Sequence, residues 1–290
     1  MNASARPGVG RTEDLAVRGG KLRLEIAGDG PPVVLLHGWM LDHRMWRPQM
    51  LALAARFRLI ALDRRGFGQS SAPPGLDEEI NDILSVASAL SLPPFFLVGM
   101  SQGGRVALRF AEQHPDKLRG LILVGTPLDG LETVPVPEES IPFDHYARLA
   151  REGRVEEVRQ AWLAHPLMRV EEPKTARLVE EMVGDYAGRD LLIPRETRGK
   201  PVDLSRILVP ALVITGEKDS SERRQMGDAI AAGLATSTRA SIPGAGHLCN
   251  ISHPQLFNSL LREFLEMLMH PNIERTDASK AETGHLPRSE

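Results

Sequence analysis

Short apolar runs alternate along this chain with longer stretches in which apolar residues recur at helical spacing. The runs are bounded by Gly, Pro and polar residues, as buried strands are, whereas the longer stretches are typical of amphipathic helices. The runs predict parallel strands near residues 32–36, 58–62, 95–98, 120–124, 211–215 and 238–242. This alternation of strands and helices predicts an α/β protein.

The pattern differs at the two ends of the chain. Two short strands, around Asp14–Val17 and Lys21–Ile26, flank a Gly-Gly pair, which is a hairpin signal. After Pro254, apolar residues repeat at helical spacing and predict a closing helix with the proline in its first turn. From Asn272 onward the chain is polar and aperiodic, and we expect a disordered tail there.

The composition is that of a globular chain. Of its 290 residues, 42% are hydrophobic and 25% charged, which suffices for one large core. The net charge of −3 and the lack of a Lys/Arg cluster argue against nucleic acid or an anionic membrane as a partner. No run approaches the ~18 apolar residues of a membrane span, and Met1 to Gly10 lack the apolar region of a signal peptide. We therefore expect a cytoplasmic protein, and its oligomeric state stays open.

The most specific chemical signal is the sequence Gly99-Met-Ser-Gln-Gly103. It follows an apolar run that predicts a strand and precedes an apolar-periodic helix from Arg105 to about His114. This is the context of a Gly-x-Ser-x-Gly nucleophile elbow, a strained turn that exposes a serine hydroxyl at the carboxyl end of a strand. The two glycines are needed because strand and helix approach too closely for side chains. Ser101 is therefore the candidate nucleophile.

A serine hydroxyl needs a base, and the base needs an orienting acid. His247 opens a Gly-rich loop after one predicted strand, and Asp219 follows another. Glu217, two positions before Asp219, is a rival for the acid, as is Asp129, which follows an earlier strand. The residues alone thus indicate His247 as the base and leave three candidates for the acid.

The chain order Ser101, Asp219, His247, with each residue just past a predicted strand, resembles the triad of α/β-hydrolase-fold enzymes. The resemblance implies that Asp219 is the acid, because a Gly-x-x-Asp ending after that strand is the usual form of the family. It also implies a doubly wound, mostly parallel sheet with an inserted helical lid. Residues 128 to about 200, which precede the strand near 211–215, show helical stripes and no strand pattern, and this is the usual place for the lid in the family. The corresponding division of the chain is 1–127 and 201–271 for the two parts of the core, 128–200 for the lid and 272–290 for the tail.

The first parallel strand is followed by His37-Gly38-Trp39-Met40. In relatives with a His-Gly turn at this place, backbone N–H groups point at the developing oxyanion. The resemblance implies that these donors are the N–H groups of Trp39 and Gln102. We interpret His37 itself as structural rather than catalytic. The candidate lining of the substrate pocket is apolar and consists of Met40, Leu41, Phe143, Trp162, Met168 and Leu248.

A further turn, Asp63-Arg-Arg-Gly-Phe-Gly-Gln-Ser70, resembles the Asp-x-Arg-Gly-x-Gly-x-Ser loop of the same fold. We interpret it as structural, with Asp63 and Arg65 pinning the loop by side-chain hydrogen bonds. The loop also closely resembles that of the cofactor-free haloperoxidases, which act as perhydrolases. Those enzymes usually carry a proline where this chain has Met40, and they read Ser-Met-Gly where it has Ser101-Gln-Gly.

No cofactor and no metal are expected. The Cys, His, Asp and Glu residues do not cluster at ligand spacing, and the sequence has no phosphate-binding Gly-rich loop. The single cysteine, Cys249, lies two residues after His247 and is interpreted as a small packed residue. One cysteine also excludes an intramolecular disulfide.

Together these motifs predict a serine esterase or lactonase that cleaves a small-molecule carboxylic ester or lactone through an acyl-enzyme on Ser101. A serine at the elbow argues against haloalkane dehalogenases and epoxide hydrolases, which use a carboxylate nucleophile. Two alternatives stay open: perhydrolase chemistry from the same triad, and a small-ligand receptor on the same scaffold. The intact triad and oxyanion turn favour an enzyme over a receptor.

Overall fold

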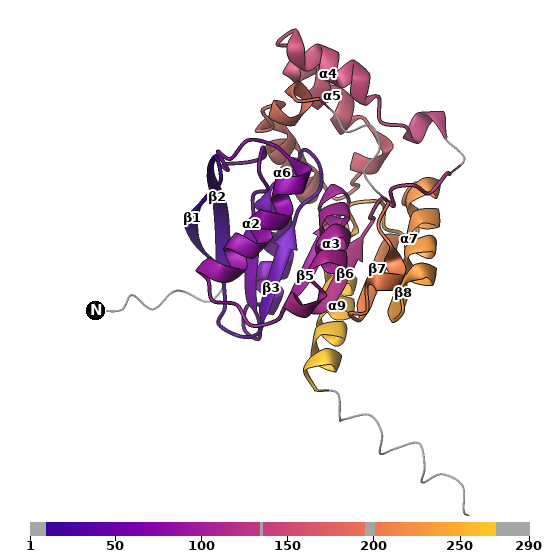
Figure 1. Cartoon of the computed structure of the whole chain (residues 1–290). Coiled ribbons are helices and arrows are strands. Elements are labelled where there is room, and N and C mark those ends of the chain that lie inside the picture. The colour runs from indigo at the N-terminus through magenta and orange to yellow at the C-terminus, as the bar shows by residue number, and fades with distance from the viewer. Residues whose placement is uncertain (1–9, 134–135, 195–200, 271–290) are drawn as a thin grey trace, which may run out of the picture.

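The computed structural model describes residues 10–133, 136–194 and 201–270. These residues build one sheet with helices on both faces (Figure 1). The strands lie side by side in the order β1-β2-β4-β3-β5-β6-β7-β8. Their bounds are β1 Arg11–Val17, β2 Gly20–Ala27, β3 Pro32–Leu36, β4 Arg58–Leu62, β5 Phe95–Met100, β6 Leu118–Val124, β7 Ala211–Gly216 and β8 Ser237–Ile242.

Six strands, from β4 through β3 to β8, pair in parallel, while β1 and β2 are antiparallel to their neighbours. The chain enters the parallel part in its interior, at β3, and adds strands on both sides, so the sheet is doubly wound. The fold predicted from the apolar runs is therefore confirmed. The predicted hairpin is confirmed as well, because β1 pairs with β2 along its full length.

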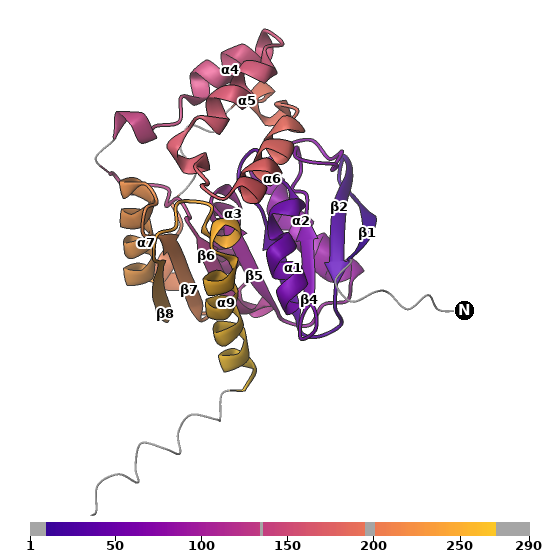
Figure 2. The ribbon, with the colours of Figure 1, turned by 180° about the vertical axis from the view of Figure 1, so that it is seen from behind.

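Helices cover both faces of the sheet because alternate side chains of each strand point to opposite sides. Helices α2, α3 and α7 cover one face, and α1 and α9 cover the other (Figure 2). Within β3, Val34 and Leu36 pack with the first group, and Val33 and Leu35 with the second. Every position of β3 and β5 is buried, as expected for strands that are covered on both faces.

The helix that closes the fold, α9, begins at Pro254, as the apolar repeat predicts. In the part of the chain that the structure describes, no helix is both long and apolar enough to cross a membrane. The helices are α1 Arg47–Leu53, α2 Leu76–Ala89, α3 Gln102–Gln113, α4 Phe143–Arg151, α5 Val155–Leu163, α6 Pro173–Gly184, α7 Ser221–Gly233, α8 Cys249–Ser252 and α9 Pro254–Met269.

Between β6 and β7 the chain leaves the sheet and forms α4, α5 and α6, which lie together beyond one end of it (Figure 1). The described part of residues 128–200 contains no strand, as the sequence predicts. Trp39, just past β3, contacts Tyr146 of α4 and Trp162 of α5, so this inserted segment lies over the carboxyl ends of the parallel strands. The predicted disordered tail, 272–290, lies outside the described residues.

Candidate active site

The turn between β5 and α3 holds Ser101 in a strained backbone conformation. Its φ of 51° and ψ of −118° lie in a region of backbone conformation that residues other than glycine rarely adopt. The Ser101 N–H donates to the carbonyl oxygen of Val124 at 2.7 Å, and the N–H groups of Gly104 and Arg105 donate to the Ser101 carbonyl. These bonds tie the turn both to β6 and to the first turn of α3. The side chain of Ser101 is thereby presented, partly exposed, at the carboxyl end of β5.

The glycines of this turn are required by close backbone contacts. A Cβ atom at Gly99 would lie 2.5 Å from the carbonyl oxygen of Gly103. A Cβ atom at Gly103 would lie 2.6 Å from the carbonyl oxygen of His37, which follows β3. Both distances are far below van der Waals contact, so only glycine allows α3 to start this close to β5 and β3.

His247 and Asp219 form a buried hydrogen-bonded pair. His247 Nδ1 lies 2.9 Å from Asp219 Oδ2 and 3.1 Å from Oδ1, and both side chains are almost fully buried. The imidazole also packs against Gly125, where a Cβ atom would lie 2.7 Å from His247 Cε1. Because Gly125 follows Val124, the acceptor of the Ser101 N–H, the serine and the histidine flank the same end of β6.

The two rival acids lie in other surroundings. Glu217 Oε2 accepts the N–H of Gly244 at 2.7 Å and so holds the loop after β8. Asp129 is paired with Arg105 and Arg109 of α3. The structure therefore brings Asp219, and neither rival, into contact with the ring of the histidine.

The turn after β3 passes directly over the serine. A Cβ atom at Gly38 would lie 3.5 Å from the Cβ of Ser101. His37 is fully buried, and its Nε2 accepts the backbone N–H of Arg64 at 2.9 Å, so its proton resides on Nδ1, which donates to the Gly38 carbonyl at 2.7 Å. Burial lowers the pKa of His37 to about 3 and keeps the ring neutral. The ring of His37 thus connects this turn to the loop after β4, which is a structural role.

The side chain of Trp39 connects this turn to the inserted segment. Its indole Nε1 donates to Asp190 Oδ2 at 2.7 Å, and the Tyr186 hydroxyl donates to Asp190 Oδ1 at 2.6 Å. Burial raises the pKa of the Asp190 carboxyl, although both hydrogen bonds act in the opposite direction. Asp190 and Tyr186 are not predicted from the sequence, because both lie in a stretch without helical periodicity and only the path of the chain brings them to Trp39.

The predicted pocket residues belong, with Trp39, to one large apolar cluster, the core on the side of α1 and α9, and two of them contact Trp39 directly. Phe143 and Trp162 each lie 4.8 Å from the Trp39 ring, measured between ring centroids. The predicted residues that belong to this cluster are Met40, Leu41, Phe143, Trp162, Met168 and Leu248. All are buried except Phe143, which is partly buried.

A cleft of about 520 Å³ opens beside this cluster. Its walls include Gln102 at the start of α3, together with Phe143 and Asp190 of the inserted segment. Ser101 does not line it. The cleft therefore lies beside the start of α3, between the loop after β4 and the inserted segment, and neither Trp39 nor His247 lines it.

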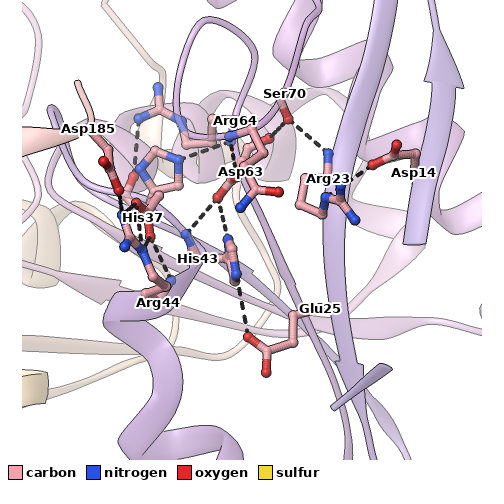
Figure 3. Close-up of polar contacts among 12 residues, drawn as sticks. Asp14, Arg23, Glu25, His37, His43, Arg44, Asp63, Arg64, Ser70 and Asp185 are labelled. Atoms are coloured by element: carbon pink, nitrogen blue, oxygen red, sulfur yellow. Dashed lines mark hydrogen bonds and ion pairs between the residues drawn. The ribbon is translucent and has the colours of Figure 1, made fainter. Parts of the chain in front are cut away.

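The loop after β4 is held by Asp63, as Figure 3 shows. Asp63 Oδ1 accepts the backbone N–H of His43 at 2.8 Å and lies 2.6 Å from His43 Nδ1, while Oδ2 accepts the N–H of Gln69 at 2.7 Å. Asp42, His43 and Asp63 form the one group of potential metal ligands in the described ranges. Their atoms already have partners, since Asp42 pairs with Arg44, so the arrangement fits a pinned loop better than a metal centre.

Cys249 is fully buried at the start of α8. Burial raises the pKa of its thiol above the usual range, so the reactive thiolate is strongly disfavoured. This environment agrees with the prediction of a small packed residue.

The chain is similar to known hydrolases. A family model described as alpha/beta hydrolase fold matches residues 31–254. The pimeloyl-(acyl-carrier protein) methyl ester esterase of Chromobacterium violaceum is 30% identical over 258 residues, which cover 84% of this chain and 98% of that protein. Epoxide hydrolase B of Mycobacterium tuberculosis is 36% identical over 136 residues, 43% of this chain and 38% of that protein. Among solved structures, a malate-bound esterase from Thermogutta terrifontis is similar with a TM-score of 0.74 and 25% identity, and the match covers 89% of this chain and 99% of that one.

Proposed function

The chain belongs to the family of the α/β-hydrolase fold, and from this premise we propose that it is a serine hydrolase whose substrate is a small-molecule carboxylic ester or lactone. The observation that carries the proposal is the buried pair of His247 and Asp219 at the end of β6, next to the strained elbow of Ser101. The elbow suits a nucleophile, and the pair supplies an imidazole in a defined orientation.

In the proposed reaction, Ser101 Oγ attacks the carbonyl carbon of the substrate while His247 Nε2 accepts the hydroxyl proton. Asp219 accepts the Nδ1–H and stabilises the imidazolium that forms. The imidazolium then protonates the leaving oxygen, so an alcohol departs and the acyl group stays on Ser101. Water, deprotonated by His247, releases the carboxylic acid and regenerates the serine. With a lactone, the alcohol and the acid remain in one molecule.

Two backbone donors are proposed to stabilise the tetrahedral oxyanion. The Gln102 N–H is the first of α3, so it lacks an acceptor within the helix and carries the positive end of the helix dipole. The Trp39 N–H follows Gly38, which lies against Ser101. Removing one such donor typically lowers kcat about 100- to 1,000-fold, so the pair matters as much as the base.

We propose that the inserted segment, 128–200, acts as a lid. Its Trp162 and Phe143 pack against Trp39, and Met168 belongs to the same apolar core. An apolar cover of this kind excludes water and gives an acyl or alcohol group a hydrophobic contact surface. The identity of the substrate then depends on the shape of this cover rather than on the triad.

The relatives support ester chemistry to different extents. The esterase from Chromobacterium violaceum matches over nearly its whole length, but epoxide hydrolases are also among the relatives, so the comparisons alone do not separate the two chemistries. Epoxide hydrolases of this fold use a carboxylate nucleophile, and this chain has Ser101 at that position. The nucleophile therefore favours an ester or lactone over an epoxide.

The experiment is a comparison of purified protein with its Ser101→Ala variant on aryl esters of rising acyl length, alkyl methyl esters and lactones. We expect turnover by the unchanged protein only, and covalent labelling by a fluorophosphonate at Ser101. Retention of more than a tenth of the turnover by Ser101→Ala contradicts the proposal, as does labelling at a different residue.

A further inference from the structure

The guanidinium of Arg64 contacts both segments that carry the proposed oxyanion donors. Its Nη1 donates to Gln102 Oε1 at 3.0 Å and to the carbonyl oxygen of His37 at 3.1 Å. Its Nε and Nη2 donate to the carboxylate of Glu79 at 2.6 and 2.8 Å. The Arg64 side chain is fully buried, whereas its partner Gln102 is partly exposed at the cleft.

The main chain of Arg64 adds a further bond to the same turn. Its N–H donates to His37 Nε2 at 2.9 Å (Figure 3). His37 is thereby held through its ring and through its carbonyl group, and it directly precedes Gly38 and Trp39. One residue of the loop after β4 thus fixes the turn after β3 and, through Gln102, the start of α3.

We propose that Arg64 is a positioning residue that holds the two oxyanion donors at the spacing required for one oxygen atom. The inference rests on the proposed function. The Trp39 and Gln102 N–H groups come from separate segments and must converge on one oxygen within about 3 Å each. A displacement of about 1 Å at a reacting centre costs on the order of 100-fold in rate. A two-pronged contact with Glu79 of α2 fixes the plane of the guanidinium, which a single ionic contact does not do.

The neighbouring pair of Arg65 and Asp82 provides a matched control. Arg65 Nε and Nη2 donate to the Asp82 carboxylate at 2.6 and 2.7 Å, and these side chains are only 3% and 4% exposed. This pair also joins the loop after β4 to α2. Its remaining bond goes to the carbonyl oxygen of Pro73 rather than to the turn after β3 or to α3.

The test replaces each ion pair as a whole. In Arg64→Met/Glu79→Met both charges are removed together, which avoids leaving one buried charge unpaired. Arg65→Met/Asp82→Met is the control of equal construction. For each protein, kcat and KM are measured on the best ester, together with the melting temperature and the affinity for a trifluoromethyl ketone, whose serine adduct carries an oxyanion.

We expect Arg64→Met/Glu79→Met to lower kcat and the affinity for the ketone by tenfold or more, with KM changed less than threefold. In the control, Arg65→Met/Asp82→Met, we expect kcat to stay within threefold of the unchanged protein even if the melting temperature falls. An equal loss of kcat in both double variants overturns the proposal, because the effect is then one of loop stability. A kcat within threefold of the unchanged protein in Arg64→Met/Glu79→Met also overturns it.

Gln102→Met removes the other end of the contact and keeps the proposal testable if the double variant does not fold. We expect a loss of kcat of threefold or more from this single change, and no further loss when it is added to Arg64→Met/Glu79→Met. An unchanged kcat in Gln102→Met, or independent effects that multiply in the combined variant, overturns the proposal. An active Ser101→Ala variant would instead contradict the serine mechanism itself, so the two failures are distinguishable.

Discussion

Ser101 has an unfavourable backbone conformation that the fold maintains. A non-glycine residue at φ 51° and ψ −118° typically costs about 1–3 kcal/mol. The hydrogen bond to Val124 and the bonds from Gly104 and Arg105 hold the turn in place, and Gly99 and Gly103 let the surrounding backbone close around it. The strain therefore serves to expose the hydroxyl rather than to stabilise the protein.

This strain predicts that two inactivating substitutions differ in their effect on stability. Ser101→Gly removes the Cβ that makes the conformation unfavourable, whereas Ser101→Ala keeps it. After allowing for the greater freedom of glycine in the unfolded chain, we expect Ser101→Gly to exceed Ser101→Ala by about 1 kcal/mol in the free energy of unfolding. Urea unfolding of both variants measures this difference. A Ser101→Gly protein less stable than Ser101→Ala would show that the turn is not strained.

Replacement of Asp219 tests the assignment of the acid. Asp219→Asn removes the acceptor that keeps the His247 proton on Nδ1, and we expect kcat to fall on the order of a thousandfold or more. Glu217→Gln and Asp129→Asn are the matched controls, since these carboxylates bond to Gly244 and to arginines of α3. The measurement is kcat of the three variants from steady-state kinetics. A larger loss in either control than in Asp219→Asn would contradict the assignment.

Buried, neutral His37 predicts how stability depends on pH. Between pH 6.5 and about 3 the unfolded chain binds a proton at this ring and the folded protein does not. The free energy of unfolding therefore falls as the pH falls through this window, by at most about 1.4 kcal/mol per pH unit from this group. In His37→Gln, whose amide can accept the Arg64 N–H, we expect a shallower slope between pH 7.5 and 5. Equal slopes in the two proteins would exclude this contribution.

At the scale of elements, the strands and the inserted segment differ in how far sequence predicts them. Buried parallel strands are continuous apolar runs, so β3 and β4 have their predicted bounds. The prediction ends β5 two residues early, because Gly99 belongs to the elbow signal and yet is still paired with β3. For the inserted segment, helical stripes indicate that helices form, but they contain no information on which side chain meets Trp39.

The contact between Asp190 and Trp39 predicts local loosening of the inserted segment when it is lost. Asp190→Ala leaves the Trp39 indole N–H and the Tyr186 hydroxyl without their acceptor, at a cost of about 1–3 kcal/mol. We expect faster hydrogen exchange in α4 to α6 and an unchanged sheet. Asp185→Ala is the control, because its carboxylate is 65% exposed and pairs with Arg44 at the surface. If the hydrogen-exchange rates of α4 to α6 are the same in the unchanged protein and in both variants, this coupling is refuted.

For the whole molecule, sequence predicts those parts of the candidate site that lie in contiguous motifs. Ser101, Asp219 and His247 each follow a strand, and adjacent parallel strands end at one edge, so their convergence follows from the topology. The supports of the site are different. Arg64 belongs to a loop whose motif indicates a structural role, and Asp190 belongs to a stretch without helical periodicity. Both reach the site only through packing between distant segments. Such contacts depend on the complete fold rather than on a local pattern.

The surroundings of Trp39, including its bond to Asp190, make the intrinsic tryptophan fluorescence sensitive to the position of the inserted segment. The sequence has three tryptophans, and two of them, Trp39 on the sheet side and Trp162 on α5, lie with their rings 4.8 Å apart. Emission from an indole depends on the charges and rings around it, so any motion that separates α5 from the turn after β3 alters the intrinsic fluorescence. Replacing the third, Trp46, with phenylalanine would leave a signal that comes only from this junction. Stopped-flow mixing with substrate would then show whether α5 moves relative to this turn during turnover, and how fast, in unlabelled protein.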